Sequence, residues 1–398
     1  MMLPKFEESQ LDQHLKEIIN CKWKKTVLEN GKTNCIVLCV ATVDTLKTNE
    51  NKNKKVVARF YGKNTSTFIN RERELENIQF LSEYGLAPKI LKIFNNGYIL
   101  EYKEGKVLNL DQMAKYKKLI AEEMRKYHSL KQNGPSNLFK TLNDWYWKAY
   151  VNHKDFLLKN NILKMIKQAE EQTKNCKTGF CHNDLLSSNM ILSFNENNTL
   201  SDIINISRNN VDNLDNLDNS VSPNNLSPNK VGSNKVGSNN SYSVSPNNLN
   251  PNNTYSVSPN KVGSNIQTEK LTFIDFEYSG INFISYDLAN HFREYIGYSF
   301  DIKKFPNESD IIEFLQYYYG SNINDKIIKH TIKEIRYFLP LVDIFWGLWA
   351  LLKSDQVEKS EDCSEKNDTI RSTDFDYMKY AKFKIGLVPE DFSDWWIE

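Results

Sequence analysis

The sequence predicts an α+β protein made of a small β-rich N-terminal part and a larger helical C-terminal part. Short runs rich in β-branched and aromatic residues gather near the N-terminus, whereas stretches with helical spacing dominate from Leu110 onward. A stretch rich in Asn, Ser and Pro at residues 197–267 interrupts the helical part. We therefore expect an N-terminal domain at residues 1–105, a C-terminal domain at residues 106–398, and a disordered insert within the second.

In the N-terminal part, three runs have the composition of strands: Cys35–Val43, Lys55–Tyr61 and Gly97–Tyr102. A predicted helix, Ile69–Ser82, lies between the second run and the third. Its apolar residues Leu75, Ile78 and Leu81 recur at every third position, so they fall on one side of a helix.

The C-terminal part contains four stretches that predict helices: Met113–His128, Leu142–Ala169, Ile311–Tyr319 and Lys329–Leu352. Two short apolar runs in this part predict strands, Gly179–Cys181 and Leu271–Asp275. Each of these two runs leads into polar residues that carry candidate chemistry.

The charge balance argues against several classes of protein. The chain has 51 Lys and Arg against 50 Asp and Glu, which gives a formal net charge of +1. A nucleic-acid-binding protein or a polybasic membrane anchor would need clustered positive charge, so neither is expected.

The sequence contains no run of about 18 apolar residues, so no transmembrane helix is expected. The first residues lack the apolar stretch of a signal peptide, and none is expected.

The six cysteines are spread along the chain without a CxxC pair. This pattern fits neither a disulfide framework nor a zinc site. We therefore expect a reducing, cytoplasmic setting.

Residues 197–267 have the composition of a disordered segment. The repeat SVSPN begins at Ser220, Ser243 and Ser256, and apolar residues are few. Such a stretch cannot bury enough apolar area to offset the entropy lost on ordering. We interpret it as an insertion tolerated in a surface loop.

The candidate catalytic chemistry begins at GFCHNDLLSSNMIL, residues 179–192. A short strand leads into His182-Asn183-Asp184, and Asn189 follows five positions after the aspartate. This is the spacing of a phosphotransferase loop, in which the Asp orients the attacking hydroxyl and the Asn coordinates Mg²⁺. Taken alone, the match leaves a solvated turn as the alternative.

A second motif, KLTFIDFEYSGINFISYDLANHFREY, spans residues 270–295. Its first strand delivers Asp275 to the place where a metal-binding aspartate would pair with Asn189. Once residues 197–267 are set aside, the chain between Asn189 and Asp275 has the length of a β-hairpin. The insert is therefore expected at the tip of a hairpin that joins the catalytic loop to the metal-binding strand.

Together, HNDLLSSNMIL and IDFEYSGINFISYDLANHF resemble the choline/ethanolamine kinases. The resemblance extends to VVARFYG, FNNGYILEYKEG, FWGLW and STDFDYMKYA, and covers nearly all of the chain outside the insert. It implies a two-lobed, protein-kinase-like fold, with ATP as co-substrate and Mg²⁺ as cofactor, and it suggests a homodimer. Antibiotic phosphotransferases usually lack the second motif, which argues against that class.

For ATP, the resemblance implies a set of residues in the N-terminal part: Arg59, Glu74, Gly31, Thr33, Asn34, Glu101 and Tyr102. Arg59 stands where a protein kinase has its phosphate-contacting lysine, and Glu74 could pair with it. The turn that begins at Gly31 resembles the family's phosphate-covering turn. The segment at Glu101 resembles the hinge beside the adenine.

The resemblance also implies the catalytic residues Asp184, Asn189 and Asp275 and the metal ligands Asn189, Asp275 and Glu277. The acceptor would be a small cationic amino alcohol, which aromatic faces and a carboxylate can hold. The candidate substrate-binding residues are Asp184, Tyr278, Glu294, Trp346, Trp349 and Tyr380. Two of them, Trp346 and Trp349, are three positions apart in a predicted helix, so both can line one pocket. Aromatic residues at this spacing are also typical of a core.

The histidines are not expected to act as bases. His182 resembles the histidine that braces the catalytic loop, and His291 is interpreted as fixing local structure through hydrogen bonds. His128, beside Tyr127 in a helical stretch, is interpreted as a helix-face residue.

The choice between ethanolamine and choline depends on the ammonium group. A primary ammonium donates three hydrogen bonds, whereas a quaternary ammonium donates none and needs a fuller aromatic cage. After Glu294 this chain has Tyr295, Gly297 and Ser299, so the cage looks less complete. We expect ethanolamine as the main substrate, giving phosphoethanolamine for phosphatidylethanolamine synthesis. The alternative is a choline kinase or a dual choline/ethanolamine kinase, and an inactive kinase-like scaffold is a third, less favoured interpretation.

Overall fold

The computed structural model describes residues 5–30, 34–42, 54–62, 65–132, 134–195, 268–361 and 375–389. The described residues up to Ser193 and from Lys270 onward belong to one compact unit. The insert predicted at residues 197–267 lies outside the described residues, and so do Gly31 and Thr33.

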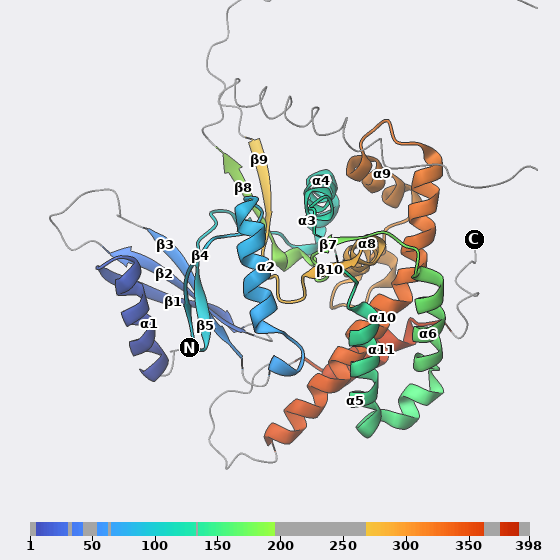
Figure 1. The fold of residues 1–398 in the computed structure, drawn as a ribbon, viewed down its shortest axis with the longest axis horizontal. Helices are drawn as coiled ribbons and strands as arrows, with labels where there is room; N and C mark the ends of the chain where they lie inside the picture. The colour runs from blue at the N-terminus through green and yellow to red at the C-terminus, as the bar shows by residue number, and fades with distance from the viewer. Residues whose placement is uncertain are drawn as a thin grey trace, which may run out of the picture. The chain divides into compact units, whose positions relative to one another are not determined.

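The N-terminal part is built on a five-stranded antiparallel sheet, drawn in blue and cyan in Figure 1. In spatial order its strands are β1 (Lys22–Asn30), β2 (Asn34–Thr42), β3 (Lys55–Tyr61), β5 (Gly97–Glu101) and β4 (Ile90–Phe94). The three predicted strands correspond to β2, β3 and β5. The edge strands β1 and β4 were not predicted from the sequence, and none of their side chains whose burial the structure describes is fully buried.

Alternation within β3 decides which side chains face which helix. Helix α1 (Lys5–Ile18) packs on one face of the sheet. Residues of α1 and β3 form a separate apolar cluster there: Leu11, Leu15, Val56, Ala58 and Phe60. Arg59 therefore points to the opposite face, where it lies across from Tyr98 of β5. Helix α2 (Arg71–Glu83) contributes Glu74 near Arg59 on this second face.

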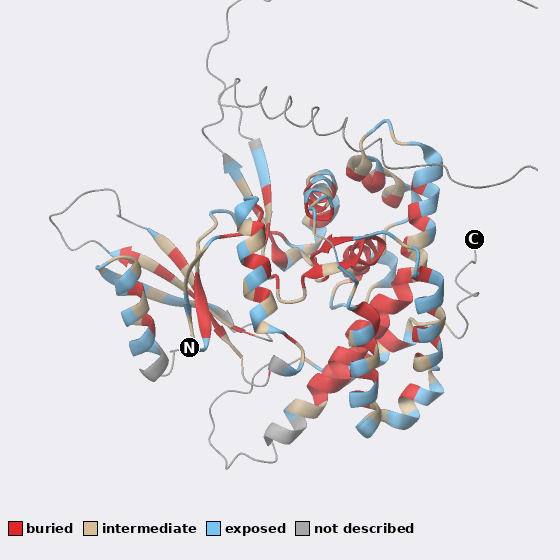
Figure 2. Cartoon of the chain, viewed as in Figure 1, coloured by how far each residue is buried: buried red, intermediate tan, exposed pale blue. Residues whose placement is uncertain are grey.

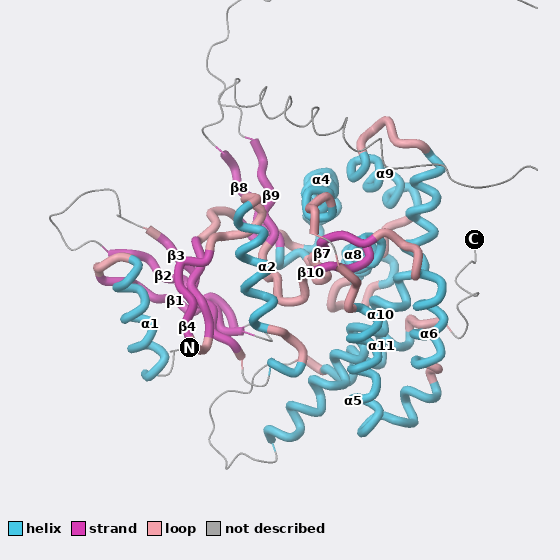
Figure 3. The backbone as a smooth tube through the Cα atoms, viewed as in Figure 1, coloured by secondary structure: helices cyan, strands magenta, loops and turns pink. Residues whose placement is uncertain are grey.

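Most of the C-terminal part is helical, as the cyan tube in Figure 3 shows. Its α-helices are α3 (Leu110–Lys115), α4 (Lys117–His128), α5 (Leu138–Lys159), α6 (Ile162–Thr173), α8 (Ile284–Arg293), α9 (Glu308–Tyr319), α10 (Asp325–Glu361) and α11 (Tyr377–Gly386). Single 3-10 turns are η2 (Thr65–Thr67), η3 (Ser187–Asn189), η4 (Glu294–Ile296) and η5 (Ile302–Lys304).

Two of the predicted helices are divided in the structure. The first is interrupted at Tyr116, which separates α3 from α4, and the second at Asn160-Asn161, which separates α5 from α6. Asn161 has a φ of 51°, a left-handed conformation that ends a helix and that Asn tolerates. Helix α8 was not predicted, because all of its residues are buried and it therefore lacks the one-sided pattern of a surface helix.

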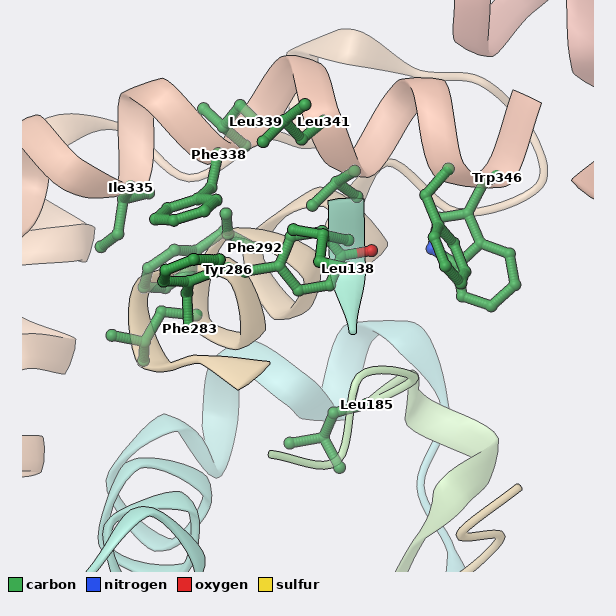
Figure 4. Close-up of a cluster of buried hydrophobic side chains, with 14 of the residues drawn as sticks. Leu138, Leu185, Phe283, Tyr286, Phe292, Ile335, Phe338, Leu339, Leu341 and Trp346 are labelled. Atoms are coloured by element: carbon green, nitrogen blue, oxygen red, sulfur yellow. The ribbon is translucent and has the colours of Figure 1, made fainter. Parts of the chain in front are cut away.

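Helix α10 is the central helix of the C-terminal part, and Figure 2 shows it buried along most of its length. The close-up in Figure 4 shows Phe338 of α10 facing Phe283 and Tyr286, with ring centres 5.1 Å and 6.1 Å away. By length and composition alone α10 could cross a membrane, with a mean hydropathy of 1.5 in its most apolar window. Because 89% of that window is buried inside the protein, its apolar composition reflects a place in the core.

Two small sheets carry the candidate catalytic segments. β7 (Thr178–Cys181) pairs with β10 (Gly280–Phe283), and β8 (Met190–Asn195) lies between β6 (Lys106–Val107) and β9 (Thr268–Phe273). The strand predicted to end at Asp275 therefore ends at Phe273. The reason is that Asp275 has a φ of 70°, which is incompatible with a strand.

The predicted order of a small β-rich part and a larger helical part is confirmed. The domain boundary expected after residue 105 falls between β5 and β6. It stays a prediction, because both sides of it belong to the same compact unit.

Replacing residues 197–267 by a short Gly-containing turn is expected to leave folding and turnover intact. β8 and β9 are neighbours in one sheet, so a short connection can join Asn195 to Thr268. The thermal unfolding midpoint and the turnover number of this variant, compared with the full chain, test the expectation. A variant with an unchanged midpoint and lost turnover would show that the insert contributes to the active site.

Candidate active site

The candidate catalytic loop follows β7 and turns at Asn183. This residue has a φ of 65°, in the left-handed region that Asn tolerates better than most residues. Its Nδ2 donates to the backbone carbonyl of Tyr278 at 2.9 Å, and its Oδ1 accepts from Asn282 at 2.8 Å. Asn183 therefore both bends the chain and joins the loop to the segment after Asp275.

His182, the first residue after β7, links the same loop to the segment that follows β9. Its Nε2 lies 3.0 Å from the backbone carbonyl of Ile274, and its ring packs on Phe273 and Phe276. Burial lowers the pKa of His182, which favours the neutral ring that donates one hydrogen bond. The backbone N–H of Ile274 in turn donates to the carbonyl of Asn189 at 3.0 Å. The loop and the end of β9 are thus one hydrogen-bonded unit.

Asp287, on α8, anchors the backbone of the loop. Its carboxylate accepts from the backbone N–H groups of His182, at 2.9 Å, and Asn183, at 2.7 Å. Its Oδ2 also lies 3.0 Å from Nε2 of His128, whose Nδ1 contacts the hydroxyl of Tyr318 at 2.8 Å. Burial acts to raise the pKa of Asp287, but these hydrogen bonds and nearby histidines outweigh it, so the pKa is lowered.

This arrangement corrects the interpretation of His128 as a helix-face residue. Its side chain is buried between α4 and α8 and supports the loop through Asp287. The sequence analysis gave Asp287 no role, although it quoted the motif that contains it. A weak signal was present, because Asp287 is flanked by the apolar residues Ile284, Tyr286, Leu288 and Ala289, and a buried aspartate must have hydrogen-bond partners.

Asp184 and Asn189 lie next to each other. Nδ2 of Asn189 donates to the backbone carbonyl of Asp184 at 2.8 Å and lies 3.3 Å from its Oδ2. Burial, followed by the charges of Asp275, Glu294 and Glu277, raises the pKa of Asp184. A carboxylate among other carboxylates is a favourable neighbour for a metal ion or an ammonium group.

Arg59 connects the N-terminal sheet with these acidic residues. Its Nη2 lies 2.6 Å from Oδ1 of Asp275 and 2.9 Å from Oε2 of Glu277. Asn34, at the start of β2, also donates to Glu277 at 2.9 Å. Burial acts to lower the pKa of Arg59, but the surrounding carboxylates raise it, so the guanidinium stays charged. Burial and the charge of Asp275 raise the pKa of Glu277.

Glu74, on α2, is buried, and Arg59 is not its closest partner. It accepts from Arg71 at 2.8 Å and from the hydroxyl of Tyr98 at 2.8 Å. The pair between Arg59 and Glu74 is present at 3.7 Å. Arg71, whose guanidinium also lies 4.4 Å from the ring centre of Tyr61, was missed by the sequence analysis.

The acidic residues have the geometry and chemistry to hold a divalent cation. Oxygen atoms of Glu74, Asp275 and Glu277 lie within 4.8 Å of one another, and Mg²⁺ prefers oxygen ligands. The Arg59 guanidinium bonded to Asp275 and Glu277 shows that a cation fits beside both. Asn189 uses its Nδ2 toward Asp184, which leaves its Oδ1 as the ligand atom. Glu74, Asp275 and Glu277 therefore offer oxygen ligands that fit such an ion, and the place of Asn189 beside Asp275 and Glu277 in a metal site stays a prediction.

Glu101 and Tyr102 lie where the chain leaves β5. The backbone N–H of Glu101 donates to the carbonyl of Lys89 at 3.0 Å, so this group is already occupied. Lys55 lies 5.1 Å from the ring centre of Tyr102. Within the described part of the chain, neither residue contacts the acidic cluster around Asp275, and their place beside an adenine stays a prediction.

Aromatic rings from α10 and α11 form a continuous wall. The ring of Trp346 lies 5.3 Å from Tyr278 and 5.7 Å from Trp349, and Trp349 lies 5.6 Å from Tyr377. The indole N–H of Trp346 donates to Asn290 at 2.8 Å, which fixes the ring. The two tryptophans are thus brought together on one side of α10, where both are buried.

Glu294, directly after α8, lies within electrostatic reach of Tyr380 on α11. Its charge acts, after burial, to raise the pKa of both Asp184 and Tyr380. The ring of Tyr380 lies 6.4 Å from Tyr298, which is 56% exposed and was missed by the sequence analysis. Asp184 and Glu294 are therefore two carboxylates within electrostatic reach of each other beside aromatic rings.

The sequence of this chain is similar to those of one family of known proteins. The sequence model of the choline/ethanolamine kinase family matches residues 26–388. The chain is 24% identical over 372 residues to probable choline kinase 1 of Arabidopsis thaliana, covering 87% of this chain and 80% of that protein. It is 23% identical over 375 residues to a probable ethanolamine kinase of the same plant, covering 89% of this chain and 80% of that protein.

Solved structures give a matching fold. An ethanolamine kinase of Plasmodium vivax is similar with a TM-score of 0.64 at 22% identity, covering 94% of this chain and 84% of that one. The expected two-lobed, protein-kinase-like fold is confirmed by this likeness.

Asp287→Ala is expected to lower the free energy of unfolding by about 3–5 kcal/mol, because it leaves the backbone N–H groups of His182 and Asn183 buried without an acceptor. Urea unfolding followed by circular dichroism measures the change. The matched control Asp144→Ala, at an exposed position on α5, should stay within about 0.5 kcal/mol of the unaltered chain. Equal stability of the two variants would contradict the anchoring role of Asp287.

Proposed function

Because the chain belongs to the choline/ethanolamine kinase family, we propose that it transfers the γ-phosphoryl group of ATP to the hydroxyl of ethanolamine. The observation that carries this proposal is the pair of carboxylates, Asp184 and Glu294, beside the aromatic wall. An amino alcohol has a hydroxyl at one end and a cation at the other. Asp184 is suited to the hydroxyl, and Glu294 is suited to the ammonium.

In the proposed reaction the substrate oxygen attacks the γ-phosphorus, the bond to the bridging oxygen breaks, and ADP leaves. Asp184 orients the hydroxyl and accepts its proton, and the raised pKa of Asp184 suits it to hold that proton. Asn189 keeps Asp184 in place through its two contacts. The hydrogen bonds to Asp287 and Ile274 hold the loop rigid while the proton moves.

Mg²⁺, when bound, neutralises charge on the β- and γ-phosphates. Asn189, Asp275 and Glu277 would hold it, and Arg59 would contact the phosphates from β3. Oxygen atoms of Glu74, Asp275 and Glu277 lie within 4.8 Å of one another, which supports the assignment of Asp275 and Glu277.

The remaining ATP contacts are proposed on the N-terminal side. Asn34 and the neighbouring Gly31 and Thr33 would cover the phosphates, and the bond from Asn34 to Glu277 supports this position. Glu101 and Tyr102 would lie beside the adenine.

A primary ammonium is proposed as the preferred cation, because it can donate hydrogen bonds to Glu294. Tyr295, the residue after Glu294, packs against the ring of His291, with ring centres 5.4 Å apart. The ring of Tyr295 therefore already takes part in packing inside the protein. Choline is the second candidate, and the adjacent rings of Trp346 and Trp349 favour it, since a quaternary ammonium is held by aromatic faces.

An inactive scaffold is the least favoured function. Hydrogen bonds join Arg59 to Asp275 and Asn189 to Asp184, and the backbone N–H of Ile274, next to Asp275, donates to Asn189. A scaffold does not need these contacts. The cysteines that the structure describes are all free, which fits the proposed cytoplasmic location.

A coupled assay of ADP release with ethanolamine, its N-methylated forms and choline tests the substrate directly.

Asp184→Asn is expected to lower kcat by roughly 10²–10⁴ while ATP binding and folding are retained, because the amide keeps the shape but cannot accept the proton. Turnover by coupled ADP release and ATP affinity by calorimetry check the two halves of this expectation. Near-unaltered turnover in Asp184→Asn would remove the residue from the chemical step.

Glu294→Gln is expected to raise the KM for ethanolamine by roughly 10–100-fold, because a charge-assisted hydrogen bond to the ammonium is lost. The KM for ATP should stay nearly constant, and the loss should be smaller for choline, which donates no N–H. Initial rates with both alcohols measure these constants.

Glu170→Gln, at an exposed position on α6, is the matched control and should change neither constant. Equal losses for ATP and ethanolamine in Glu294→Gln would mean that Glu294 supports the fold. Unchanged KM values for both alcohols would place the ammonium elsewhere.

A further inference from the structure

Lys353, on the C-terminal half of α10, is a buried cation with no function assigned so far. Its side chain is 5% exposed, yet its ammonium makes no hydrogen bond or ion pair with the residues that the structure describes. Burying an ammonium costs free energy unless a partner compensates for the lost water. A buried cation without an anionic partner therefore indicates a partner that is present only during function.

Another buried lysine of the same region shows what structural pairing looks like. Lys384 of α11 is equally buried, and its Nζ lies 3.7 Å from Asp343. Asp343 also lies 2.7 Å from Arg293, so this cluster joins α8, α10 and α11 through opposite charges. Among the described residues, no carboxylate pairs with Lys353 in this way, and the comparison argues against a purely structural role for it.

Aromatic rings hold the Lys353 ammonium in one place. Its Nζ lies 4.7 Å from the ring centre of Phe68 and 6.0 Å from that of Trp349. Phe68 is itself fixed edge-on against Trp145 at 5.7 Å. These aromatic faces compensate for part of the lost hydration, and they leave the N–H donors free to point past the rings.

The charged groups near Lys353 are those of the phosphate site. Burial lowers the pKa of Lys353, the charge of Glu277 raises it, and that of Arg71 lowers it. Glu277 accepts from Asn34 and Arg59, the two residues proposed to contact the phosphates from the N-terminal sheet. Lys353, on α10, is therefore within electrostatic reach of the same carboxylate.

We propose that Lys353 binds the terminal phosphoryl group of ATP. The γ-phosphate carries the oxygens that must be held while the bond to the β-phosphate breaks, and a fixed ammonium neutralises part of their charge. Trp349, one helical turn before Lys353, belongs to the wall proposed for the acceptor. Lys353 is thus placed where the transferred group passes between nucleotide and alcohol. This inference rests on the proposed use of ATP and does not depend on which alcohol is phosphorylated.

The test compares ATP with ADP, because only ATP carries the γ-phosphate. Calorimetric titrations of Lys353→Met with each nucleotide, in the presence of Mg²⁺ and without any alcohol, measure the two affinities. We expect the affinity for ATP to fall about tenfold, as for the loss of one charge-assisted hydrogen bond, and the affinity for ADP to change less than about twofold. Lys353→Arg, which keeps the charge, should recover part of the difference.

Lys329→Met, at an exposed position of the same helix, is the matched control and should alter neither affinity. Equal losses for ATP and ADP, or no loss for either, overturn the assignment of Lys353. If Lys353→Met does not fold, as judged by its thermal unfolding midpoint, Lys353→Gln is titrated in the same way and judged by the same outcomes. An unaltered protein that binds neither nucleotide overturns both this inference and the proposed function, whereas failure with every alcohol overturns only the latter.

Discussion

The ion pairs of Arg59 are the interaction on which the candidate active site depends. Arg59 belongs to the N-terminal sheet, whereas Asp275 and Glu277 follow β9 in the helical part. Strand alternation turns Arg59 away from the α1 side of the sheet and toward these carboxylates. A buried guanidinium needs anionic partners, and buried carboxylates need cations, so each side requires the other. The pairs therefore hold the N-terminal sheet against the segment that follows β9.

A second buried carboxylate, Asp287, fixes the catalytic loop. Two consecutive backbone N–H groups donate to it, and His128 and Tyr318 continue the hydrogen bonds into α4 and α9. The loop contains a left-handed residue, Asn183, and would relax if these bonds were absent. Asp184 can therefore be presented in a fixed orientation although it lies in a loop.

Charge balance links the two ends of the proposed acceptor site. Asp184 and Glu294 raise the local negative potential, which favours a small cation over a neutral alcohol. Lys353 lies beyond Trp349 with its charge unmatched by any described carboxylate in contact with it. An amino alcohol that approaches one side and a phosphate that approaches the other would each meet an opposite charge.

The order of the two parts and most of the candidate residues could be predicted from the sequence. The spacing of Asp184 and Asn189, the apolar run before Asp275 and the strand around Arg59 are local patterns, and they predicted the order of the two parts and most of the candidate residues. The edge strands β1 and β4 were not predicted, and neither was helix α8, which is buried on every side and so lacks the one-sided pattern of a surface helix. The roles of Asp287, His128 and Lys353 were decided only by the tertiary structure. Each depends on which partners burial brings within reach, or withholds, across long distances in the chain, and no local pattern encodes that.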